Sequence, residues 1–108
     1  ICGYAGHRNE LEWYRDYDAK TINWAAVVEG VPLEEGRKVF PAHALLGGFG
    51  NLATDVLYSG TRAEVEAETQ RILAAAGRTG VILGADCTVP RDIDWNRFAW
   101  VRAAAGAR

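Results

Sequence analysis

Short apolar runs alternate with amphipathic segments along most of the chain, and glycine or proline separates many of them. The runs at 21–24, 43–46 and 81–83 have the length and boundaries of buried strands. Strands that alternate with helical patterns are typical of βα units and a parallel sheet. The pattern therefore predicts an α/β fold over residues 1–108, with parallel strands.

The best-defined helix is expected over residues 61–76. Thr61 and Glu64 have the spacing of a capping box, in which each side chain bonds the backbone N–H of the other residue. Gly77 can adopt the left-handed conformation that ends a helix. The stripe expected to face the core contains Val65, Thr69, Ile72 and Ala76.

Three other helices are expected from weaker signals. One covers residues 8–17, one begins at Pro32 and runs to about Val39, and one follows the capping residue Asp94. The glycine-rich stretch 47–51 is expected to be a loop. All four tryptophans are expected to pack in the interior, and the last helix should turn Trp95, Phe98 and Val101 inward.

Composition excludes several classes of protein. The chain has 108 residues, ordinary soluble composition and a net charge of −2, which gives no electrostatic case for nucleic acid or an anionic membrane. No apolar run approaches the roughly 20 residues of a membrane helix. Cys2 and Cys87 are too few for a disulfide scaffold, so a cytoplasmic location is expected.

The most informative loop follows the apolar run at 81–83 and carries Asp86 and Cys87. Loops at the carboxyl ends of parallel strands are where α/β proteins place their chemistry. Cys87 can be a metal ligand, a nucleophile or a small buried apolar residue. Asp86 can orient a ligand or a substrate group, or it can be an ordinary loop carboxylate.

Four segments together resemble the carboxyl-terminal part of the uroporphyrinogen decarboxylase superfamily. They are Ile1-Cys2-Gly3, the glycine-rich 46–51, 59–65 with its capping box, and Ile-Leu-Gly-Ala-Asp-Cys-Thr-Val-Pro at 82–90. The resemblance implies the carboxyl-terminal half of a (β/α)8 barrel, from the end of the fifth strand through the eighth helix. It also implies that the chain is a piece of a longer enzyme.

The superfamily has two branches, and the resemblance favours the zinc-dependent methyltransferases. These move a methyl group between a corrinoid protein and a thiol, and the resemblance implies zinc ligands at Cys2 and Cys87, with a third preceding Ile1. Ala85-Asp86-Cys87 stands where the decarboxylase branch usually has Gly-His-Gly. Expected substrate-binding residues are Gly47, Gly48, Asn51 and Asn23, and Asp86 is the candidate catalytic residue.

Two alternatives stay open. One is a metal-free decarboxylase of porphyrin biosynthesis, which needs basic side chains from outside this sequence. The other is a half barrel without catalysis, which associates with further copies through its open sheet edges. Asn23 stands where the family commonly has an acidic residue, and Tyr4-Ala5-Gly6 replaces the usual Asn-Thr, so substrate and partner stay open.

Overall fold

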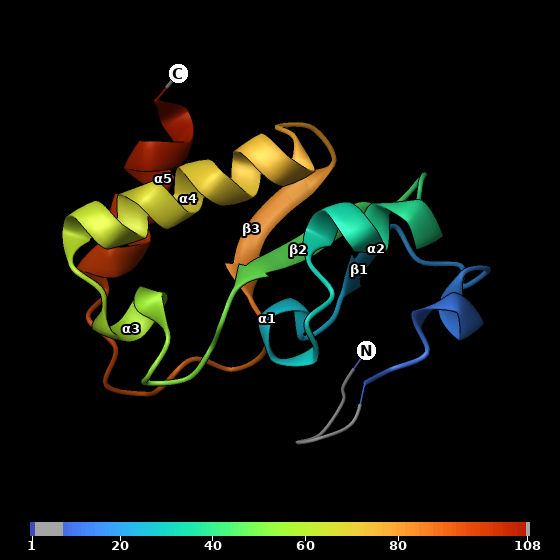
Figure 1. Cartoon of the computed structure of the whole chain (residues 1–108), viewed down its shortest axis with the longest axis horizontal. Helices are drawn as coiled ribbons and strands as arrows, with labels where there is room; N and C mark the ends of the chain where they lie inside the picture. Colours follow the sequence, from blue (N-terminus) through green and yellow to red (C-terminus); the bar gives the residue numbers. More distant parts are fainter. Residues whose placement is uncertain (2–7, 108) are drawn as a thin grey trace.

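The computed structural model describes residue 1 and residues 8–107 of the chain. Its sheet contains the strands β1 (Thr21–Asn23), β2 (Ala44–Phe49) and β3 (Val81–Ala85), in the order β1-β2-β3. Both neighbouring pairs are parallel. The prediction of an α/β fold, with parallel strands that alternate with helices, is therefore confirmed as an open three-stranded sheet (Figure 1).

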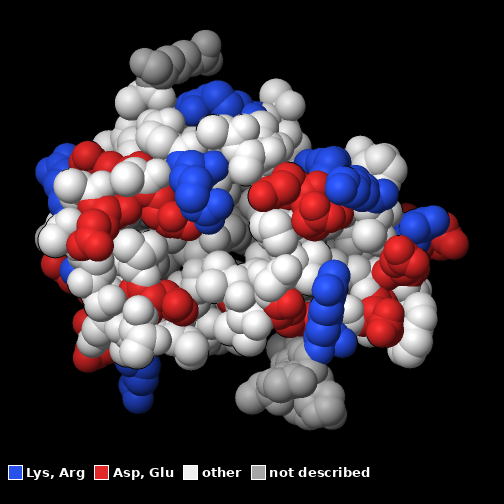
Figure 2. Space-filling model, in the orientation of Figure 1, with Lys and Arg blue, Asp and Glu red and all other residues white. Residues whose placement is uncertain are grey.

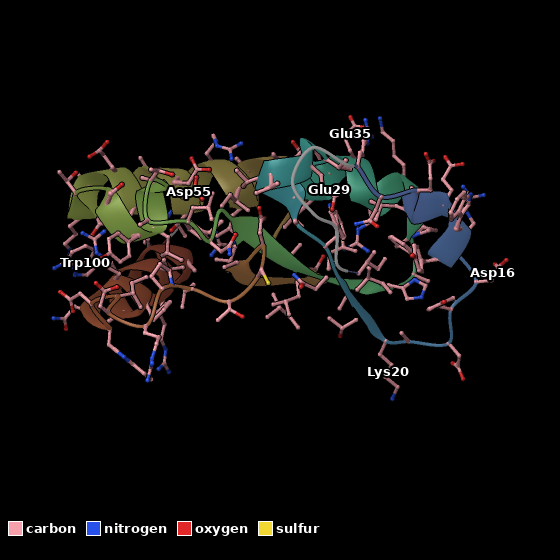
Figure 3. The ribbon with its side chains drawn as sticks, turned by 90° about the horizontal axis from the view of Figure 1, so that it is seen from below. Asp16, Lys20, Glu29, Glu35, Asp55 and Trp100 are labelled. Carbon is pink, nitrogen blue, oxygen red and sulfur yellow. The ribbon has the colours of Figure 1, made fainter. Side chains whose placement is uncertain are left out.

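The helices between the strands lie mostly on one face of this sheet. Viewed from below in Figure 3, α1 to α4 form a layer above the strands, and α5 lies beside the sheet. Among residues 1 and 8–107, no helical layer lies over the opposite face of the sheet (Figure 3). The elements are the 3-10 helix η1 (Leu11–Tyr14) and the helices α1 (Ala26–Glu29), α2 (Leu33–Val39), α3 (Val56–Ser59), α4 (Arg62–Ala76) and α5 (Asn96–Gly106).

The strand register explains which apolar side chains form the core. Ile22 and Leu45 are paired across β1 and β2, and both are buried under the helices. Successive side chains of a strand point to opposite faces. Leu46 and Ile82, one residue further along, therefore lie on the uncovered face, and Ile82 is 49% exposed. The largest buried side chains are Trp24, Phe40, Phe49, Leu33 and Leu45.

The structure confirms the capping box at the start of α4. The Thr61 hydroxyl accepts a hydrogen bond from the Glu64 N–H at 3.2 Å, and the Glu64 carboxylate accepts one from the Thr61 N–H at 2.9 Å. The bond from the Thr61 N–H, and secondly the Thr61 side chain, lower the pKa of Glu64, because they favour its charged carboxylate. Val65, Thr69 and Ile72 of the predicted stripe are buried.

Replacement of Thr61 by alanine is expected to reduce the free energy of unfolding by about 1 kcal/mol, because a helix N–H loses its acceptor. Urea denaturation followed by circular dichroism measures this change. Thr61→Ser keeps the hydroxyl and is the matched control, with an expected change well below that of alanine. Equal losses for the two variants would contradict a capping role for the hydroxyl.

Three local predictions were wrong. The helix expected over residues 8–17 is only the four-residue η1, and the expected loop at 47–51 begins as strand, because β2 continues through Gly47 and Gly48. Trp13 and Trp95 are 78% and 80% exposed, so these two tryptophans do not pack in the interior. Phe98, expected to face inward, is 37% exposed.

Acidic and basic side chains are interspersed over the face shown in Figure 2. Among the described residues, no helix is both long and apolar enough to cross a membrane.

Candidate functional site at the carboxyl edge of the sheet

The three strands end along one edge of the sheet, and Asn23 connects their ends. Its side-chain amide donates to the carbonyl of Leu46 at 2.7 Å and to that of Ala85 at 3.4 Å. The loops that leave this edge run along the lower side of Figure 1, which is the side seen in Figure 3. The Asn23 side chain, predicted to bind substrate, is thus used in holding the strand ends together.

The first residue of the chain lies at the same edge. The Ile1 amino group donates to the Asn23 carbonyl at 2.7 Å. Successive residues of a parallel strand direct their backbone N–H and carbonyl groups to the two neighbouring strands in turn. The Lys20 carbonyl accepts from the Ala44 N–H of β2, so the Asn23 carbonyl, three residues later, faces away from β2. Ile1 therefore lies on the outer side of β1. Cys2, the predicted zinc ligand that follows Ile1 in the sequence, lies outside the described residues.

Asp86 is buried directly after β3, and it is only 4% exposed. Its two carboxylate oxygens accept hydrogen bonds from the backbone N–H groups of Val27 and Val28, at 3.0 and 2.9 Å. Its own N–H donates to the Phe49 carbonyl at 2.8 Å. Asp86 therefore ties the loop after β3 to α1, across the end of β2.

The surroundings of Asp86 raise the pKa of its carboxyl group. Burial is the main cause, and the negative charges of Asp55 and Glu29 act in the same direction. The hydrogen bonds from Val27 and Val28 oppose this effect but do not outweigh it. A carboxyl group that binds its proton more tightly than usual, at the carboxyl edge of a parallel sheet, meets one physical criterion for a functional residue.

Cys87 is the exposed neighbour of this buried carboxylate. Its thiol is free, and the side chain faces solvent. The interpretation of Cys87 as a small buried apolar residue is therefore wrong. The loop after β3 thus has an anchored residue, Asp86, followed at once by a thiol that an incoming ligand can reach.

The described residues supply Cys87 as a soft donor but do not complete a metal site. No group of three or more histidine, cysteine, aspartate or glutamate side chains is placed to hold an ion within residues 1 and 8–107. A catalytic zinc ion takes three protein ligands. Cys87 can therefore serve as one ligand of the predicted zinc site. At least two further ligands must come from residues outside 1 and 8–107 or from another polypeptide.

The other predicted substrate-binding residues lie near the end of β2, with Gly47 and Gly48 in the strand and Asn51 in the loop that follows it. Asn51 donates its side-chain amide to the Thr88 carbonyl at 3.0 Å and so joins the loops after β2 and β3. A Cβ atom at Gly48 would lie 3.0 Å from Ile72 of α4, and Gly48 has a φ of +117°. Glycine is therefore favoured at position 48 for two reasons: the positive φ, and the space that the Ile72 side chain occupies.

Sequence reasoning did not single out Asp55 or Glu29, which shape the electrostatics of this edge. Asp55 accepts a hydrogen bond from the Leu52 N–H at 2.9 Å, and Glu29 accepts two from Asn9. Figure 3 shows Asp55 and Glu29 in the helical layer. An aspartate just before a short apolar helix is a recognisable capping signal, but the sequence did not indicate its distance from Asp86.

Comparison of the chain with protein-family models, with curated proteins and with solved structures gives no match. The function of the chain is therefore inferred from the geometry of this edge and from the resemblance seen in the sequence.

Proposed function

We propose that this chain supplies part of the active site of an α/β enzyme, and that the site lies at the carboxyl edge of the sheet. The reaction proposed is methyl transfer between a corrinoid protein and a thiol, as in the zinc-dependent branch of the superfamily that the sequence resembles. The observation that carries the proposal is the exposed thiol of Cys87 beside the buried Asp86, whose carboxylate accepts two backbone hydrogen bonds. Methyl transfer to a substrate thiol requires the thiolate form of that thiol. A zinc ion bound by Cys87 would supply this form by lowering the pKa of the substrate thiol.

The proposed site needs a curved sheet. Ile1, β1, β2 and β3 lie side by side, so a flat sheet would separate the backbone at Ile1 from the end of β3 by about 14 Å. Two thiolates bound to one zinc ion have sulfur atoms only about 4 Å apart. Cys2 and Cys87 therefore share an ion only if the strand ends converge, as they do around the mouth of a closed barrel.

Two features of the structure support a barrel as the complete architecture. The sheet is parallel with helices over one face, and its other face carries the exposed Ile82. Parallel sheets are normally covered on both faces, or they close on themselves. The proposed half barrel is therefore a sheet whose bare face becomes an interior once further strands are added, either from the rest of an enzyme or from another copy.

A metal-free decarboxylase ranks second. Its polycarboxylate substrate needs cationic partners, but the charges that raise the pKa of Asp86 are the acidic groups of Asp55 and Glu29. This part of the site would repel such a substrate. The edge described here therefore favours the thiol chemistry of Cys87 over recognition of carboxylates.

Cobalt binding tests the proposal. Co²⁺ replaces zinc in thiolate sites and gives a sulfur-to-metal charge-transfer absorption, so a titration of the reduced protein reports the ligand directly. The titration uses the longer enzyme that the resemblance implies, because the third ligand is expected to precede Ile1. We expect one equivalent of Co²⁺ to bind with this absorption, and Cys87→Ser to weaken binding at least about tenfold.

Cys2→Ser should weaken Co²⁺ binding to a similar extent, because the proposed site shares both sulfurs. His43→Gln is the control, since His43 precedes β2 and lies at the opposite edge of the sheet. Unchanged charge-transfer absorption in Cys87→Ser would overturn the assignment of Cys87 as a ligand.

A further inference from the structure

The outer edge of β3 presents unpaired backbone groups. The Leu45 N–H donates to the Gly80 carbonyl, and the Asp86 N–H donates to the Phe49 carbonyl. Every second residue from Gly80 to Asp86 therefore directs its backbone groups towards β2. Val81 and Leu83 direct their N–H and carbonyl groups away from β2. Ala85 directs its N–H group the same way, whereas its carbonyl accepts from the Asn23 side chain at 3.4 Å. Within the described chain no strand pairs with this side of β3. The edge is therefore a template for one more strand.

A groove runs along this edge. It has a volume of about 630 Å³, and α5 forms its far wall. α5 packs against α4 instead of covering β3: Gln70 of α4 donates to the Ala104 carbonyl at 2.6 Å, and Arg78 donates to the Ala105 carbonyl. The half-buried apolar side chains along the groove are Val81, Leu83 and Ala85 from β3 and Val101 and Ala105 from α5.

The groove has an uncompensated positive end. Arg78 and Arg102 line it, and no acidic side chain among the described residues does. Neither arginine forms an ion pair with any described residue. Arg78 bonds to Ala105 near the end of α5, and Arg102 lies one turn earlier, so both charges are at the amino end of β3. An occupant of the groove is therefore expected to carry a negative charge at this end.

Nothing in β3 protects its edge. Its sequence, Val-Ile-Leu-Gly-Ala, contains neither the charged residues nor the proline that natural edge strands use against association.

We propose that the groove between β3 and α5 binds an extended polypeptide strand of a partner protein. The strand pairs with Val81, Leu83 and Ala85, places alternate apolar side chains under α5, and brings an acidic group to Arg78 and Arg102. Strand addition of this kind takes its affinity from backbone bonds and its specificity from alternate side chains. Because α5 closes the far side, the groove admits a single strand, whereas a second sheet would meet α5. This inference rests on the half-barrel proposal, because the bound strand takes the place of the next barrel strand and the groove is also lined by Cys87. Peptide binding is measured without metal, so its failure can be distinguished from a failure of the zinc site.

A peptide with defined charge tests the inference. The probe is an acetylated and amidated six-residue peptide of alternating valine and threonine, with a glutamate added at one end and a fluorescent label at the other. Fluorescence anisotropy should show saturable binding to the 108-residue chain. Hydrogen exchange should slow at the amides of Val81, Leu83 and Ala85 when the peptide is bound. Two peptides, with glutamate at the amino or at the carboxyl end, are compared. Because the arginines lie at the amino end of β3, tighter binding of the first indicates a parallel strand and tighter binding of the second an antiparallel one.

A charge reversal provides the specificity control. Arg102 is exposed, so Arg102→Glu should leave the fold intact, weaken binding of the glutamate peptide by about fivefold or more, and favour the corresponding lysine peptide. Arg91→Glu, an equally exposed residue that does not line the groove, should bind as the unmodified chain does.

Several results would overturn the inference. They are absence of binding, equal losses for Arg102→Glu and Arg91→Glu, or a chain that sediments as a dimer with the three β3 amides already protected. The last result would show that a second copy occupies the edge. A small amphiphile that stays bound to the chain in native mass spectrometry would also overturn it, because the groove would then hold a small molecule and not a strand.

Discussion

Replacement of Gly36 by alanine is expected to lower the free energy of unfolding by about 2 kcal/mol, although alanine favours helices. A Cβ atom at Gly36, inside α2, would lie 2.1 Å from the ring of Trp24. Trp24 is fully buried, and its indole N–H donates to the Val31 carbonyl at 2.8 Å, so the ring has little room to move. Overpacking of about 3 kcal/mol should outweigh the gain of about 1 kcal/mol in helix propensity. Urea denaturation at pH 7 measures the difference.

Two further variants isolate the contact. Gly106→Ala is the matched control, because it also lies in a helix but has no atom within 4 Å of the added Cβ, and it should be neutral or slightly stabilising. Trp24→Phe removes the part of the ring that meets the new methyl group. In that background the cost of Gly36→Ala should therefore largely disappear. A cost that persists undiminished would show that the ring is not its source.

Replacement of Asp86 by asparagine is expected to cost about 2 kcal/mol of stability at pH 4. Asparagine can accept from only one of the two N–H groups of Val27 and Val28, and it turns an NH₂ group towards the other. Thermal and urea unfolding measure the loss. Asp92→Asn is the control, since Asp92 is exposed and accepts a single side-chain hydrogen bond, from Tyr58.

The pH dependence of this loss has a definite sign. The pKa of Asp86 is raised in the folded protein, chiefly by burial, so the folded state holds the proton more tightly than the unfolded state does. The resulting stability is complete below the ordinary aspartate pKa and is lost as the pH rises through the raised value. The difference in stability between the unmodified chain and Asp86→Asn should therefore shrink from pH 3 to pH 7. A difference that grows over this range would show that the pKa is lowered instead.

The same variant separates two roles for Asp86. A residue that only anchors the loop after β3 would change stability and leave the intrinsic reactivity of the Cys87 thiol nearly unaltered. A residue that also orients the thiol or its ligand would change the rate of alkylation of Cys87 under conditions in which the variant is fully folded.

The sequence was sufficient for the features that depend on local signals. Each of the three strands follows from a short apolar run, and α4 follows from its capping box and its apolar stripe. The position of Cys87 at the carboxyl edge then follows from parallel strands alone. In contrast, β2 runs through Gly47 and Gly48, where glycine suggested a loop, because Ile72 of α4 fills the space beside Gly48.

The remaining features depend on contacts between distant parts of the chain. The N–H groups that bind Asp86 belong to residues 58 and 59 positions earlier, so no local pattern indicated that this carboxylate is buried. Trp95 and Phe98 were expected to face inward because they follow a helical spacing, but α5 packs on α4 and leaves them on the surface. The groove beside β3 results from the same displacement of α5.

Crosslinking of the two cysteines tests most directly whether the sulfurs meet at the carboxyl edge. Dibromobimane joins two thiols only when they lie within a few ångströms of each other, and dilute protein prevents crosslinks between chains. We predict that peptide mapping will recover Cys2 linked to Cys87, with the link lost in Cys87→Ser. Rapid single alkylation of both thiols, without any Cys2–Cys87 link, would contradict it.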